Sequence, residues 1–101
     1  AITTPYAAPY AKHVYHHYTL KLEGVSRDGL VPYLADQGIP SMIYYPVPGH
    51  RQKMFDGMGG SGYDLPVTDW LTERVISLPM HSEMDHAQQD IIINAVKAFV
   101  G

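Results

Sequence analysis

The sequence contains no cysteine among its 101 residues. This absence excludes a disulfide framework, thiolate zinc sites and catalysis by a cysteine nucleophile. Charge is also sparse: 17% of the residues are charged, with 7 Lys and Arg against 10 Asp and Glu. The basic residues are scattered singly, whereas a nucleic-acid-binding protein usually carries a basic patch or stripe. We therefore expect no nucleic-acid partner.

Long hydrophobic runs are missing as well. No apolar segment approaches the roughly 18 residues that a membrane span requires, and no signal-peptide pattern opens the chain. We therefore expect no membrane partner and a cytoplasmic location. At 46% hydrophobic residues and a formal charge of −3, the composition is that of a folded chain rather than a disordered one.

The length fits one domain that buries a core, with no room for two full lobes and a deep cleft. This argues against a complete large enzyme. The chain has no methionine before Met42, which is typical of a piece of a longer chain, although a processed N-terminus would give the same pattern. Residues 1–12, which include Pro5 and Pro9, are predicted to be an extended lead-in from a missing large domain, and residues 13–101 the domain itself.

Hydrophobic periodicity predicts three strands and three helices in alternation. Period-two patterning predicts a strand over residues 13–23 with one half-buried face. Ser26 and Gly38 are the expected N-terminal and C-terminal caps of the helix that follows. Asp85, with Gln88 three residues on, is the expected capping-box start of the last helix. The remaining elements are expected near residues 41–45, 66–75, 76–78 and 85–99. Two helices are expected to carry apolar stripes, one of Leu30, Val31, Leu34 and Ala35 and one of Val67, Trp70, Leu71 and Val75.

The order of these elements predicts the fold. The segment 24–40 is long enough for a helical crossover between the first two strands, which the handedness rule makes right-handed. The third strand, 76–78, is then expected to insert between them. The predicted fold class is α/β (α+β-like), a three-stranded sheet with helices packed on it.

Three histidines, His13, His16 and His17, invite a metal-site interpretation because histidine is the commonest metal ligand. Strand alternation argues against it, since His16 would point to the face opposite His13 and His17. We therefore expect no metal site, and instead a half-buried His16 that is hydrogen-bonded within the fold.

A second candidate is the loop Tyr44–Gln52, in which Pro46 and Pro48 hold the backbone extended. Its phenols, imidazole, guanidinium and amide suit sugar hydroxyls, a carboxylate or a phosphate. A structural turn with packed tyrosines explains the same residues equally well. His81, in Leu78–His81, has no nucleophile or orienting carboxylate nearby in the sequence, so packing is the favoured interpretation there. A P-loop, a dinucleotide fingerprint and a nucleophile elbow are all absent from the sequence.

Three segments together resemble a known family: HVYHHYTLKL at 13–22, GIPSMIYYPVPGHRQ at 38–52 and ISLPMH at 76–81. Their order and spacing are similar to those of the C-terminal domain of the DegT/DnrJ/StrS aminotransferases. That resemblance implies the small C-terminal domain of a fold-type-I enzyme that depends on pyridoxal 5′-phosphate (PLP). Such enzymes transfer an amino group, typically from glutamate, to a nucleotide-linked keto-sugar, and are commonly homodimers.

The resemblance also implies a division of labour. The Schiff-base lysine and the other cofactor residues of the family lie in the upstream large domain, so we expect no catalytic residue in this chain. The chain alone is expected to be inactive and to bind no PLP. The alternative is a stand-alone, non-catalytic ligand-binding or interaction module with the same small-domain fold.

The expected substrate-side residues follow from the family motifs. Tyr45 matches the tyrosine of the His-Tyr-Pro motif and ranks first, and His50 and Gln52 match the rest of that motif. His16 matches a strand histidine and is expected to support the site or the domain interface. Tyr44 stands where the family more often has histidine. It remains a candidate because a phenol can donate a hydrogen bond to a sugar oxygen, although it would be uncharged near neutral pH.

Overall fold

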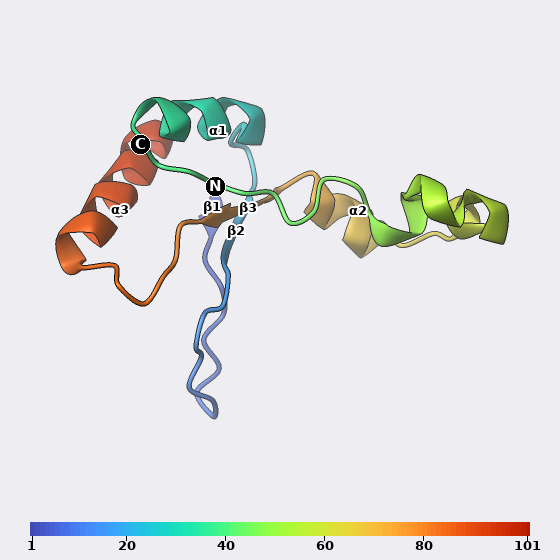
Figure 1. The fold of residues 1–101 in the computed structure, drawn as a ribbon, viewed down its shortest axis with the longest axis horizontal. Coiled ribbons are helices and arrows are strands. Elements are labelled where there is room, and N and C mark those ends of the chain that lie inside the picture. Colours follow the sequence, from blue (N-terminus) through green and yellow to red (C-terminus); the bar gives the residue numbers. More distant parts are fainter.

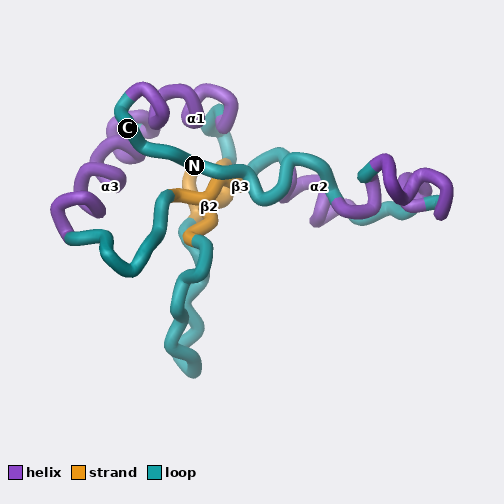
Figure 2. The backbone as a smooth tube through the Cα atoms, viewed as in Figure 1, coloured by secondary structure: helices purple, strands orange, loops and turns teal.

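The computed structural model describes residues 1–101 apart from the side chain of Ser61. Figures 1 and 2 show a small body of sheet and helix from which two arms project. The elements are β1 (Ile2–Thr3), β2 (Tyr18–Leu22), α1 (Arg27–Asp36), α2 (Pro66–Thr72), β3 (Val75–Leu78) and α3 (His86–Val100), with short 3₁₀ segments η1 (Gly49–Arg51), η2 (Lys53–Met58) and η3 (Gly60–Gly62). No helix among the described residues is long and apolar enough to cross a membrane.

The sheet has three antiparallel strands in the order β1-β2-β3, which confirms the predicted α/β class and strand number. The first predicted strand is shorter than residues 13–23. Tyr18 pairs with Leu78, and Pro79 follows immediately, so the ladder has no partner for the residues before Tyr18. Tyr15 also has a left-handed φ of 49°, which breaks the extended conformation.

The second predicted strand, 41–45, is reduced to a single bridge between Met42 and Ser77. Prolines on both sides of this segment limit its ladder, because proline lacks a backbone donor. The sheet instead gains β1, Ile2–Thr3, which pairs with β2 from within the expected lead-in. The strand predicted at 76–78 is observed as β3 and lies, as expected, between the first two predicted segments. Its residue Ser77 pairs with Thr19 of β2 on one side and with Met42 on the other.

The core lies where α1 and α3 pack against the sheet and against each other. The expected caps hold both helices. The Ser26 side chain accepts a bond from the amide of Gly29, and Asp85 forms a reciprocal capping box with Gln88, which satisfies amides that would otherwise lack partners. Gly38 follows α1 with a left-handed φ of 74°. The buried cluster consists of Leu20, Leu22, Leu30, Leu34, Ile39, Ile76, Ala95 and Val96.

Two predicted helix stripes are only partly buried. Leu30 and Leu34 lie in the core, but Ala35, expected beside them, is exposed. Val67, expected on the inner face of α2, is 70% exposed. The reason is that α2 lies outside the sheet-and-helix body, and none of its residues belongs to the core cluster.

We call residues 4–17 the N-terminal arm and residues 44–72 the central arm. In Figure 1 the N-terminal arm extends downward in blue, and the central arm extends to the right in green and yellow. The radius of gyration is 15.8 Å, whereas a compact domain of this length has about 13 Å. Both arms expose large apolar side chains, among them Tyr6, Tyr10, Val14, Met54, Met58 and Tyr63.

Candidate functional site

Four aromatic rings from the two arms meet beside the sheet. The rings of His16 and His17 stack with centroids 4.4 Å apart, and those of His17 and Tyr44 stack at 4.5 Å. Tyr44 then meets Tyr45 edge-on at 5.5 Å. We call His16, His17, Tyr44 and Tyr45 the four-ring stack. It forms because the Met42 bridge brings the start of the central arm against β3, which also pairs with β2.

Three rings of the four-ring stack, without Tyr45, line a shallow cavity of about 160 Å³. His16, His17 and Tyr44 form one part of its lining, and residues of β3 and the following turn, among them Ser77 and Met80, form another. The structure thus brings His16 and Tyr44 together, as two of the expected site residues. The intervening ring of His17 was not expected to take part.

The prediction of a half-buried His16 that is hydrogen-bonded within the fold is wrong. His16 is exposed, and its described interaction is the ring contact with His17. The strand alternation that placed these two histidines on opposite faces does not hold, since the strand begins only at Tyr18. No group of three or more His, Asp or Glu side chains in the described part of the chain is placed to hold a metal ion.

A second, larger cavity of about 540 Å³ lies beyond Tyr45 on the central arm. We call it the basic pocket. Two expected site residues, Tyr45 and Gln52, line it together, so Tyr45 belongs to both the four-ring stack and the basic pocket. Tyr45 is 66% exposed, which leaves its ring and hydroxyl accessible. The lining consists of Tyr45, Pro46, Val47, Arg51, Gln52 and Lys53.

His50 lies apart from both of these arrangements. Its side chain is only 6% exposed, and its Nε2 atom is 3.5 Å from Oδ1 of Asp69. It lines a different cavity, of about 330 Å³, with Phe55, Met58 and Tyr63. Gly60 lines the same cavity, and a Cβ atom added to Gly60 would lie 2.7 Å from the carbonyl oxygen of His50. Only glycine fits there without a shift of the backbone.

A bidentate ion pair between Arg51 and Asp69 connects η1 to α2. Nε and Nη2 of Arg51 each donate to one carboxylate oxygen of Asp69 at 2.9 Å. These hydrogen bonds are the main reason that the pKa of Asp69 is lowered and that of Arg51 raised. Sequence reasoning missed Asp69, because it lies 18 residues from Arg51 and no local pattern marks it.

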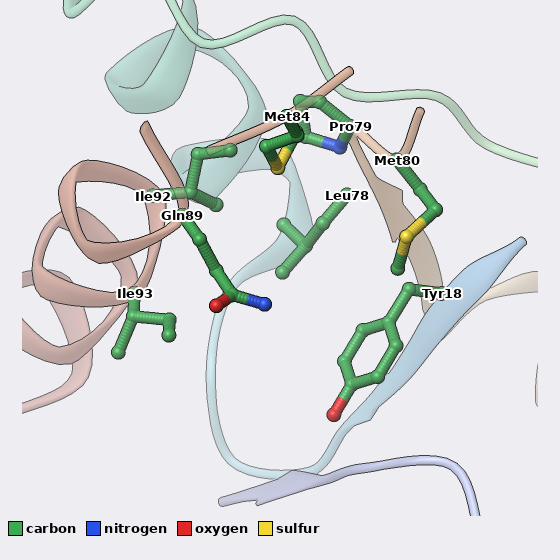
Figure 3. A pocket seen from close by; sticks show the side chains of 8 residues that line it. All are labelled: Tyr18, Leu78, Pro79, Met80, Met84, Gln89, Ile92 and Ile93. Carbon is green, nitrogen blue, oxygen red and sulfur yellow. The ribbon is translucent and has the colours of Figure 1, made fainter. Parts of the chain in front are cut away.

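An apolar cleft of about 140 Å³ lies between α3 and the end of the sheet where Tyr18 pairs with Leu78. Figure 3 shows the Met80 side chain beside the ring of Tyr18, and the Gln89 amide reaching toward the cleft from the helix side. None of the expected site residues lines this cleft. Apart from Tyr18 and Gln89 its lining is apolar, which is typical of a surface that packs against other apolar groups. The lining residues are Tyr18, Leu78, Pro79, Met80, Met84, Gln89, Ile92 and Ile93.

The described residues do not by themselves fit the PLP that the resemblance implies. A PLP site needs a lysine for the Schiff base and an acid facing the pyridine nitrogen. Lys12, Lys21 and Lys97 line none of the described cavities, and Lys53 lines the basic pocket, where no carboxylate is part of the lining. A cofactor site in this protein would therefore need residues from elsewhere.

Comparison with known proteins gives a consistent picture. Residues 1–97 match the model of the DegT/DnrJ/EryC1/StrS aminotransferase family. Over 76 residues the chain is 45% identical to the UDP-N-acetyl-3-dehydro-alpha-D-glucosamine 3-aminotransferase of Acidithiobacillus ferrooxidans, covering 75% of this chain and 20% of that protein. The chain spans about a quarter of the length of the curated relatives that it matches.

Solved structures agree in fold. A DegT DnrJ EryC1 StrS aminotransferase from Brucella abortus is 34% identical, with a TM-score of 0.84, and the match covers 99% of this chain and 26% of that one. The PLP form of a putative sugar aminotransferase from Streptococcus pneumoniae is 26% identical, with a TM-score of 0.78, covering 97% and 26%. The fold described above is therefore found as one part of larger proteins.

Proposed function

Because the chain belongs to the DegT/DnrJ/EryC1/StrS aminotransferase family, we propose that it is the C-terminal small domain of a PLP-dependent sugar aminotransferase. The whole enzyme transfers an amino group, with glutamate as the donor, to a nucleotide-linked keto-sugar. The observation that carries this proposal is the match over nearly the whole chain to about a quarter of each relative. The same match supports a large domain as this chain's partner. In this proposal the whole enzyme is a cytoplasmic homodimer, as the family resemblance implies.

In this proposal the chain supplies the substrate side of the active site. The exposed phenol of Tyr45 and the amide of Gln52 hydrogen-bond the substrate from the basic pocket. Tyr44 and His16, held by stacking on His17, offer ring faces and polar edges to a sugar. Aromatic rings present large contact area at low conformational cost, and stacking fixes their orientation before the ligand arrives.

We assign His50 a supporting part in the same site. Its motif position suggested a substrate contact, but its side chain is 6% exposed and faces Asp69. The close approach of Gly60 to the His50 backbone, together with the Arg51 ion pair, holds the loop that carries Tyr45 and Gln52. A loop positioned by a rigid support binds with less ordering cost than a free one.

PLP supplies the amino-carrying chemistry of the whole enzyme, and in this proposal the large domain provides its lysine. The isolated chain then binds no PLP and is inactive. The two arms are the surfaces that meet the rest of the enzyme, because exposed apolar residues such as Tyr10 and Met58 are costly to leave in water.

The test adds PLP to the purified 101-residue chain and, separately, assays amination by the whole protein encoded by its gene. We expect no absorbance band of a protein-bound imine with the chain alone. We expect formation of an amino-sugar nucleotide from glutamate and a keto-sugar nucleotide with the whole protein, followed by mass spectrometry. An imine band on the isolated chain, or a gene that encodes only this small domain, would contradict the proposal and favour the stand-alone binding module.

A further inference from the structure

We infer that the basic pocket binds phosphate groups, with Lys53 and Arg51 as the contacts, and that on the proposed function these belong to the diphosphate of the nucleotide-linked substrate. Lys53 was not among the expected substrate contacts, and Arg51 entered the sequence analysis only as the guanidinium of the Tyr44–Gln52 loop. Both line the cavity of about 540 Å³ that Tyr45 and Gln52 share, a volume within the ~300–1,000 Å³ range of small-molecule sites.

The donor chemistry of the pocket selects an anion. A guanidinium and an ammonium are donors without acceptor capacity, and the Gln52 amide and the Tyr45 hydroxyl add further N–H and O–H groups. No carboxylate is part of the lining. Gln52 and Tyr45 can also accept hydrogen bonds, as an uncharged sugar would require. The preference for a phosphate therefore comes from the two cationic groups, Arg51 and Lys53, since hydrogen bonds between charged partners are the stronger ones.

Arg51 is held in place for this role. Asp69 takes the Nε and Nη2 donors, and among the described residues no acceptor bonds to Nη1. The ion pair raises the pKa of Arg51, chiefly through the hydrogen bond to Asp69, so the guanidinium stays charged. A guanidinium that is already oriented loses little rotamer freedom when a second anion reaches its free edge.

Lys53 supplies the net charge. Asp69 offsets the charge of Arg51, whereas no ion pair within the described part of the chain involves Lys53. Lys53 is the first residue of η2 and is exposed, so its ammonium is free to move toward a ligand. Pro46 and Val47 form the apolar part of the lining.

The position of Tyr45 connects this pocket to the rest of the site. Its ring meets Tyr44 edge-on in the four-ring stack, and it also lines the basic pocket. One ligand that spans both features would place a sugar ring at the stack and its phosphates at Lys53 and Arg51. This order matches a sugar linked through a diphosphate to a nucleoside.

The test titrates the 101-residue chain with inorganic pyrophosphate and with UDP at constant ionic strength, followed by backbone amide NMR shifts. We expect saturable shifts at Gln52 and Lys53 with both ligands. K53Q raises Kd by about tenfold, as expected for the loss of one charge-assisted contact, and K53R binds within about twofold of the unchanged chain. The matched control K97Q removes an exposed lysine of α3 and leaves Kd unchanged.

The inference is overturned if pyrophosphate gives no saturable shift, or if K53Q and K97Q behave alike. In the whole enzyme, K53Q is expected to raise KM for the keto-sugar nucleotide with kcat nearly unchanged. Amination with an unaltered KM in K53Q would overturn the phosphate site and leave the proposed function intact. Specific pyrophosphate binding without any amination by the whole protein would overturn the proposed function and leave the phosphate site intact.

Discussion

The body and the arms of this molecule differ in how completely their apolar side chains are buried. In the body, Leu30, Leu34 and Ile76 are completely buried, and both long helices are capped by side chains. In the arms, Tyr10 is 88% exposed and Met58 is 76% exposed. The body is built to hold itself together, whereas the arms carry apolar residues that the described chain leaves uncovered. Every expected site residue lies on an arm or at its base.

The largest contrast is expected from large-to-small substitutions. Leu34→Ala in the body removes a fully buried side chain and should lower the free energy of unfolding by about 2–5 kcal/mol. Met58→Ala on the central arm should change it by less than about 0.5 kcal/mol. Urea unfolding followed by circular dichroism measures both. Equal costs would mean that the arms belong to the folded core.

A smaller effect is expected at the helix cap of the body. Asp85→Ala removes the side chain that accepts from the amide of Gln88 at 2.8 Å and should cost about 1 kcal/mol. Asp85→Asn keeps an acceptor at the same position and is the matched control, with little loss. Thermal unfolding of the three chains tests this, and an Asn variant as unstable as the Ala variant would assign the effect to charge instead.

A similar loss is expected inside the sheet. The hydroxyls of Thr19 and Ser77 share a hydrogen bond of 2.8 Å across β2 and β3, and Ser77 is buried. Ser77→Ala leaves the Thr19 hydroxyl without this partner and should cost about 1 kcal/mol. The double variant Ser77→Ala with Thr19→Val should recover part of the loss in urea unfolding. A double variant that is less stable by the sum of both single losses would show that the pair is not coupled.

The smallest global effect is expected from the ion pair of the central arm. Because the pKa of Asp69 is lowered in the folded chain, its contribution is present above the unfolded pKa of about 3.9 and is lost as pH falls through the folded value. Asp69→Asn should therefore remove the pH dependence that Asp69 imposes on the Arg51 side-chain NMR signals in the acid range, while the free energy of unfolding of the body stays unchanged. A shift in the body's stability would contradict the separation of arm and body.

Local signals predicted the helices well. Ser26, Gly38 and the Asp85–Gln88 pair act within a few residues of one another, so their roles follow from spacing alone, and the structure confirms them. Strands depend on distant partners, and the alternation over 13–17 was misleading because Pro79 ends the strand opposite. Pairing of Ile2 with Leu22 leaves no local trace in the sequence.

The site was predictable to the same limited extent. The motif around Tyr45 drew attention to two residues, Tyr45 and Gln52, that the structure places in one cavity. It did not reveal that His50 is buried against Asp69, because that contact joins two elements far apart in the chain. The histidine pair at 16 and 17 is visible in the sequence. Its stacking on Tyr44 could not be predicted, because it depends on the bridge between Met42 and Ser77.

The central claim is that this chain supplies the substrate side of a sugar aminotransferase. The most direct measurement compares kcat/KM for amination of a keto-sugar nucleotide by the whole enzyme carrying Tyr45→Ala with that of Lys97→Ala. Lys97 is an exposed residue of α3, outside both arms, and lines none of the described cavities. We expect Tyr45→Ala to lower kcat/KM by about 10–100-fold, the effect of losing about 1.4–2.7 kcal/mol of transition-state binding, and Lys97→Ala to change it less than about threefold. Equal values for the two variants would contradict the account.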